Sequence, residues 1–111
     1  METITTLPIV IQVVPDRKLE AMLAQLTPAT SWGNRKIAAE KLGSLRNPQA
    51  LPVLLDALLT DSFWMVRSAI IQALVMIGDP AAIPALAEVA ERDSFQVIRS
   101  YARRAIQRLS Q

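Results

Sequence analysis

The chain has 111 residues, of which 51% are hydrophobic and 20% are charged, and its formal net charge is +2. A composition this apolar can bury a core, which excludes an intrinsically disordered chain, and the length suits one small domain. The lack of cysteine excludes disulfides and thiolate metal sites. A net charge this small does not by itself indicate a polyanionic partner, and we expect a cytoplasmic protein.

The first 15 residues differ from the rest of the chain. The N-terminus begins with acidic Glu2, and residues 7–14 form a β-branched apolar run that Pro8 interrupts and Pro15 ends. This is neither a secretion signal nor a membrane span. Because β-branched residues favour an extended backbone, we predict an extended segment over residues 1–15. Residues 7–14 either strap the first repeat, which we favour, or pair as an added strand with a second copy in a homodimer.

A repeat of 32 residues begins at residue 16. The segment Asp-Ser-Phe-Trp-Met-Val-Arg at 61–67 returns as Asp-Ser-Phe-Gln-Val-Ile-Arg at 93–99. The same offset aligns Pro48 with Pro80, Pro52 with Pro84, Arg35 with Arg67 and Arg99, and Leu42 with Leu74 and Ile106. A fixed period of this length is typical of stacked repeats. It predicts a repeat domain over 16–111, with units at about 16–46, 47–78 and 79–111.

The pattern of apolar residues predicts two amphipathic helices in each unit. In the central unit, apolar residues recur at steps of three and four over residues 51–58 and again over 66–77. Gly78 favours a left-handed helix end, Asp79 can cap the next helix, and Pro80 suits its first turn. Gly-Asp-Pro therefore predicts a boundary between units.

The repeated segment predicts the turn inside each unit. We expect Asp61 or Ser62 to cap the second helix, Phe63 to fill the turn and Val66 to be the first core residue. Asp93, Ser94, Phe95 and Ile98 would repeat these roles in the third unit.

Over residues 16–111 this pattern resembles HEAT repeats, and in particular the short HEAT-like repeats of phycobilisome lyases. Pro52 and Pro84 match the proline of the family's first helix, and Asp61, Val66 and Arg67 match its turn signature. The first unit departs from the pattern, since it has Glu20 for proline, Ala29 for aspartate and Asn34 for valine. The resemblance implies an all-α fold, a short right-handed α-solenoid of three helical hairpins, with partners on the face formed by the second helices.

The three aligned arginines allow two interpretations. Arg35, Arg67 and Arg99 could form a row of cations that grips phosphates or acidic side chains. Alternatively, each could reach an aspartate on the turn of a neighbouring unit, Asp61 or Asp93, and so fix the stacking of the repeats. We favour this structural ladder, because charges that repeat with the unit usually serve the unit.

A stripe on the second helices does not repeat and is our predicted partner site. It carries Trp32 in the first unit and Trp64, Ser68, Ile71 and Val75 in the second. An exposed apolar patch of this kind usually marks a partner surface. The alternative is that the stripe is buried between adjacent helices.

The last helix is basic. Arg99, Arg103, Arg104 and Arg108 lie in a stretch without acidic residues, and polar side chains would let this end of the stack face water. We interpret these arginines as an electrostatic rim of the partner site. Cations near the C-terminus of a helix are also stabilised by the helix dipole. Nucleic-acid binding through them is a less favoured alternative, since only Tyr101 supplies an interleaved aromatic.

The chain lacks the residues that most often carry out catalysis. The chain has no histidine, no cysteine and only three glycines, so it offers no Ser-His or Cys-His pair, no ordinary zinc site and no Gly-rich phosphate loop. We therefore predict a non-catalytic protein-interaction module, an adaptor or scaffold, with no cofactor and no membrane association. The family resemblance implies a further alternative, an accessory protein or chaperone related to bilin lyases.

Overall fold

The computed structural model describes residues 16–111, and the structural statements below concern these residues. They form six α-helices: α2 (Arg17–Ala24), α3 (Trp32–Leu45), α4 (Leu51–Thr60), α5 (Trp64–Ile77), α6 (Ile83–Arg92) and α7 (Gln96–Leu109). Short 3-10 turns, η2 (Pro48–Ala50) and η3 (Pro80–Ala82), precede α4 and α6, and the described part contains no strand. The predicted all-α fold is confirmed. The predicted strap or partner strand at residues 7–14 lies outside the described residues.

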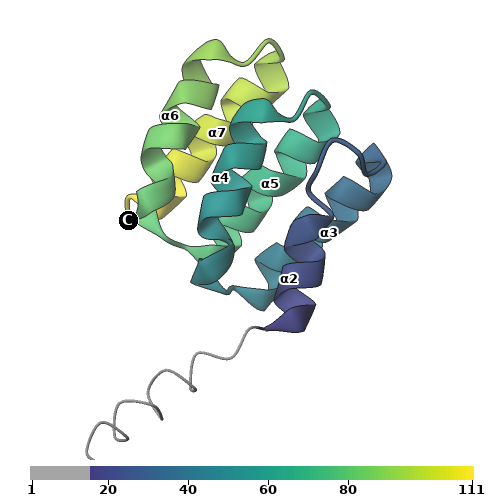
Figure 1. Ribbon diagram of the computed structural model, residues 1–111. Helices are drawn as coiled ribbons and strands as arrows, with labels where there is room; N and C mark the ends of the chain where they lie inside the picture. Colours follow the sequence, from purple (N-terminus) through teal and green to yellow (C-terminus); the bar gives the residue numbers. More distant parts are fainter. Residues whose placement is uncertain (1–15) are drawn as a thin grey trace, which may run out of the picture.

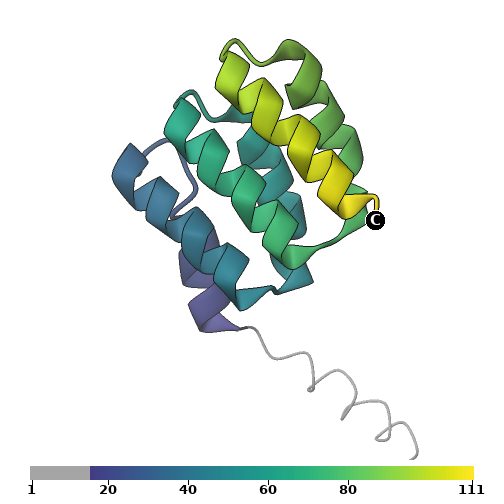
Figure 2. The ribbon, with the colours of Figure 1, turned by 180° about the vertical axis from the view of Figure 1, so that it is seen from behind.

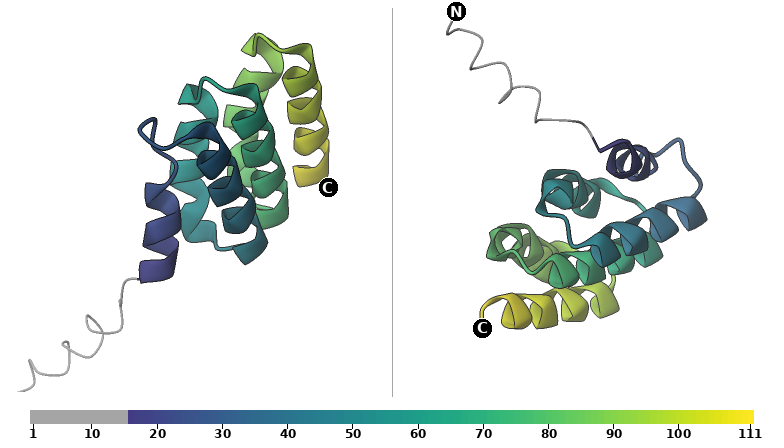
Figure 3. Two further views of the ribbon diagram at one scale, coloured as in Figure 1. Left: turned by 90° about the vertical axis from the view of Figure 1, so that its right-hand side faces the viewer. Right: turned by 90° about the horizontal axis from the view of Figure 1, so that it is seen from below.

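The helices form two layers in a short solenoid-like stack. Helices α2, α4 and α6 lie in one layer, and α3, α5 and α7 lie side by side in the other (Figures 1, 2 and 3). The central helix α5 contacts α3, α4 and α7, so it is surrounded by protein on three sides. This explains why α5 is apolar around most of its circumference, with Val66, Ile70, Ile71 and Leu74 all buried.

The Gly-Asp-Pro segment at 78–80 links the end of α5 to the start of η3. Gly78 ends α5 at φ 78°, and its N–H donates to the Leu74 carbonyl over 3.0 Å. The Asp79 carboxylate accepts from the Ala81 N–H over 2.9 Å, with Pro80 in the first turn. The capped turn is η3, and it leads into α6. Arg46 adopts the corresponding left-handed conformation at the end of α3, with φ 52°.

The predicted capping of α5 by Asp61 or Ser62 is wrong. Phe63 occupies the N-cap position and makes no side-chain cap, while Asp61 Oδ1 accepts from the Phe63 N–H over 3.0 Å. Phe95 and Asp93 repeat this arrangement before α7, over 2.9 Å. The aspartate thus shapes the turn just before the helix instead of capping it, because its carboxylate also binds an arginine of the preceding unit.

That arginine comes from the second helix of the unit before. Arg35 Nε donates to Asp61 Oδ2 over 2.7 Å and its Nη2 donates to Asp61 Oδ1 over 3.2 Å. Arg67 binds Asp93 in the same way, over 2.7 and 2.9 Å. Both pairs are largely withdrawn from water, with side-chain exposures of 10% and 6% for the first and 10% and 5% for the second. Two parallel bonds fix both the distance and the angle between partners, so each pair orients one unit on the next.

The three aligned arginines, Arg35, Arg67 and Arg99, also donate to the turn of their own unit. Arg67 Nη1 donates to the Asp61 carbonyl over 3.1 Å, and Arg99 Nη1 donates to the Asp93 carbonyl over 2.5 Å. In the first unit, where Ala29 replaces the aspartate, Arg35 Nη1 donates to the Thr30 carbonyl instead. Turn, helix and neighbouring unit are therefore joined through one guanidinium group at each step.

Replacing Asp61 with Ala should destabilise the fold by about 3 kcal/mol, because it leaves the buried Arg35 guanidinium without its carboxylate. The free energy of unfolding can be measured by urea denaturation followed by circular dichroism.

Glu88→Ala is the matched control. It breaks the Arg92–Glu88 pair, in which the side chains are 77% and 55% exposed, and should cost less than about 0.5 kcal/mol. Equal losses for the two variants would contradict the role of the buried pairs in the stack.

Candidate functional site

The two seams between the second helices are built differently. Gly43 on α3 lies directly against α5, and a Cβ at this position would come within 2.7 Å of the Ala73 Cα and 2.9 Å of its Cβ. The absence of a side chain therefore lets α3 and α5 approach closely. Val75 occupies the equivalent position in the next unit and lies in the seam between α5 and α7. Accordingly, α3 contacts α5 more extensively than α5 contacts α7.

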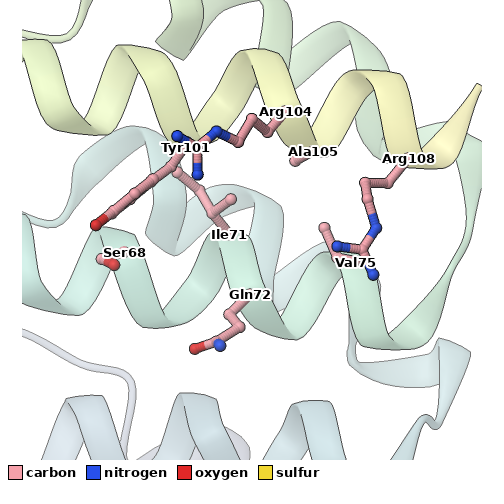
Figure 4. Close-up of a pocket in the computed structure, with 8 residues that line it drawn as sticks. All are labelled: Ser68, Ile71, Gln72, Val75, Tyr101, Arg104, Ala105 and Arg108. Atoms are coloured by element: carbon pink, nitrogen blue, oxygen red, sulfur yellow. The ribbon is translucent and has the colours of Figure 1, made fainter.

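The wider seam between α5 and α7 contains an open groove. Its volume is about 410 Å³. Helix α5 contributes Ser68, Ile71, Gln72 and Val75, and helix α7 contributes Tyr101, Arg104, Ala105 and Arg108 (Figure 4). We call this site the α5–α7 groove.

The groove has an apolar floor and a polar rim. Ile71 and Ala105 are buried at its base, and Val75 is half-buried. The side chain of Arg108 extends from α7 towards Val75, and the hydroxyl end of Tyr101 reaches towards Ser68 (Figure 4). The lining includes two guanidinium groups and no carboxylate, so the site is locally cationic.

The predicted partner stripe is only partly exposed. Ile71 is 4% exposed, and Ala39 and Gly43, which occupy the corresponding stripe of α3, are buried. The stripe is largely the contact between neighbouring second helices, so its prediction as an open apolar patch is wrong for these positions. Ser68 and Val75 remain accessible because the α5–α7 seam is wide.

The two tryptophans lie at the turn end of their helices and are not among the residues that line the groove. Trp32 packs against Phe63 of the next unit with ring centroids 4.5 Å apart, and Trp64 packs against Phe95 at 6.0 Å. The Arg67 guanidinium carbon lies 5.7 Å from the centre of the Phe95 ring. Each tryptophan thus contributes to contacts between units. Trp32 keeps 44% of its surface exposed, whereas Trp64 is half-buried.

The four arginines of α7 do not form one stripe. Arg104 and Arg108 line the α5–α7 groove. Arg99 and Arg103 line a different depression beside α6, together with Glu88, Glu91 and Arg92. Arg103 Nη2 donates there to the Ala90 carbonyl over 3.4 Å. The predicted rim is therefore divided between a purely cationic site and one of mixed charge.

Three groove residues were missed by the sequence prediction: Gln72, Tyr101 and Ala105. They form a site because α7 lies beside α5 with a groove between them. The replacement of glycine by valine between Gly43 and Val75 was the sequence signal that could have indicated this gap.

Two other classes of site are not found in the described part of the chain. Within residues 16–111, no three His, Cys, Asp or Glu side chains are grouped closely enough to hold a metal ion. None of the described helices combines the length and apolar composition that crossing a bilayer requires.

Comparison with known proteins agrees with the repeated hairpins. The sequence model of HEAT repeats matches residues 19–107, which is most of the chain. The chain therefore belongs to the HEAT-repeat family, whose members generally mediate protein–protein interactions. No curated protein matches the chain.

Replacing Gly43 with Ala should cost about 1–3 kcal/mol of unfolding free energy, because the new methyl group would overlap the backbone of α5 at Ala73. Chemical denaturation measures the loss.

Gly33→Ala in the same helix is the control, since its Cβ would meet nothing within 4 Å. It should be neutral or stabilising by up to about 1 kcal/mol, through helix propensity alone. A Gly43→Ala protein as stable as the Gly33→Ala protein would contradict the close α3–α5 seam.

Proposed function

We propose that this protein is a non-catalytic protein-interaction module, an adaptor or scaffold, that binds a partner through the face formed by α3, α5 and α7. The observation that carries the proposal is the α5–α7 groove. It combines an apolar floor with polar and charged side chains around it, which is the usual composition of protein interfaces. It also lies on helices held rigidly by the Arg–Asp pairs and the core, so little ordering is needed on binding.

The tryptophans have a smaller part in this proposal than the sequence indicated. Trp64 is half-buried against Phe95, so its removal would weaken the contact between units. Trp32 offers exposed aromatic surface at the edge of the face and is the better candidate for a peripheral partner contact.

Nucleic-acid binding has less support. A duplex or single strand is usually held by a continuous row of cations. Here Arg99 and Arg103 lie near Glu88 and Glu91, which leaves only two arginines on the groove side of α7.

A bilin-related role rests on the resemblance to phycobilisome lyase repeats, and no contact among the described residues adds to it. Catalysis also has little support, because the sequence has neither histidine nor cysteine and the groove lining contains no carboxylate.

Site-directed photocrosslinking tests the proposal. A photoreactive residue at Gln72, on the rim of the groove, should yield a defined crosslinked partner in an extract of the source cells. The same residue at Asp56, exposed on α4 in the other layer, should not.

Val75→Glu should reduce the Gln72 crosslink roughly tenfold, since it places a charge on the apolar floor. Ala87→Glu, an equal change at an exposed position of α6, should leave it unchanged. Crosslinking that is the same from Gln72 and Asp56 would reject the proposal.

A further inference from the structure

Three equivalent positions on the second helices change charge along the stack. Glu40 on α3, Gln72 on α5 and Arg104 on α7 occupy the same place in successive units. All three are exposed. Glu40 is paired with Lys36 over 2.7 Å, so the first unit presents a neutralised pair where the third unit presents a cation. The face formed by these helices is therefore most positive at the α5–α7 groove.

The arginines of the groove differ from the others in what surrounds them. Arg35 and Arg67 bind buried carboxylates, and Arg99 and Arg103 donate to backbone carbonyls beside α6. Within residues 16–111, Arg104 and Arg108 take part in no ion pair and donate no hydrogen bond. Two exposed guanidinium groups of like charge next to an apolar floor are complementary to carboxylates.

We propose that the α5–α7 groove binds an acidic segment of a protein partner, an inference that rests on the proposed function and adds the chemistry of the partner. Arg104 and Arg108 lie one helical turn apart, at a rise of about 6 Å. Two carboxylates four residues apart on a partner helix have the same spacing. Each can accept from one guanidinium group, while an apolar side chain between them covers Ile71, Val75 and Ala105. The hydroxyl of Tyr101 and the amide of Gln72 stand at the rim as further polar contacts.

The groove favours a peptide over a nucleic acid for two reasons. A phosphate backbone would leave the apolar floor uncovered, whereas an amphipathic acidic helix covers the floor and the arginines together. The two other arginines of α7 also lie on a different side of the helix, beside Glu88 and Glu91, where a polyanion following the groove would not reach them.

Fluorescence anisotropy with a synthetic helical peptide tests the proposal directly. The probe is a fluorescein-labelled peptide that carries Glu at positions i and i+4 with Leu between them, and its counterpart has Gln in place of Glu. The wild-type protein should bind the Glu peptide roughly tenfold or more tightly than the Gln peptide. Arg104→Glu with Arg108→Glu should weaken binding of the Glu peptide by at least about tenfold.

Arg92→Glu with Arg103→Glu is the matched control. It changes the net charge of the protein by the same amount, at exposed positions on the α6 side. Binding should stay within about twofold of wild type, since only general screening is altered. Circular dichroism checks that both double variants fold.

In the binding assay, three results would overturn the acidic-segment proposal. They are equal affinity for the Glu and Gln peptides, equal loss in the two double variants, and tighter arginine-dependent binding of a DNA oligonucleotide than of the Glu peptide. A Gln72 crosslink that depends on Val75 but survives Arg104→Glu with Arg108→Glu would also overturn it, and would leave the proposed function standing. If the photoreactive residue gave the same crosslinks from Gln72 as from Asp56, the proposed function itself would be rejected.

Discussion

A single helical hairpin in this protein has more apolar surface than its own two helices can cover, and this constraint organises the rest of the structure. The hairpins stack so that α5, in the middle, is covered by α3, α4 and α7. The hydrophobic effect favours burial of this surface but has no preferred direction. The bidentate pairs Arg35–Asp61 and Arg67–Asp93 supply that direction at each step. The Asp61 backbone and carboxylate also join the turn to the helix that follows, so stacking and local structure depend on the same few atoms.

The proposed partner surface lies where the repeat is imperfect. Gly43 lies in the close seam between α3 and α5, and Val75, at the equivalent position, lines the groove between α5 and α7. Several residues around the groove differ between units: Val75 aligns with Gly43 and Gln107, and Gln72 aligns with Glu40 and Arg104. Residues that join the units, such as Arg67 and Asp93, repeat because each junction between units uses the same contact. A small repeat protein can thus keep a constant scaffold and carry a specific site on it.

The arginines illustrate how burial separates two uses of one residue type. Arg35 and Arg67 are almost enclosed, and each must be satisfied by a carboxylate and a carbonyl within the fold. Arg104 and Arg108 stand exposed at an open groove. The same guanidinium chemistry stabilises the stack in the first case and is available for recognition in the second. Arg104 and Arg108 take no part in the pairs Arg35–Asp61 and Arg67–Asp93, so substituting these two arginines removes no contact of the ladder.

The sequence by itself determined the period, the hairpins, the boundary at Gly78 and Asp79, and the residues that could join one unit to the next. These features are readable because they repeat, and because helix periodicity and turn chemistry act over only a few residues. The tertiary structure decided which side of each second helix meets its neighbour. In the folded chain Ile71 is buried, and the tryptophans pack against the phenylalanines of the following turns. The arginines of α7 lie on two sides of the helix, and a groove lies beside Val75. Such outcomes depend on the distance and rotation between helices that are 32 residues apart in the chain, set by packing that no local pattern records.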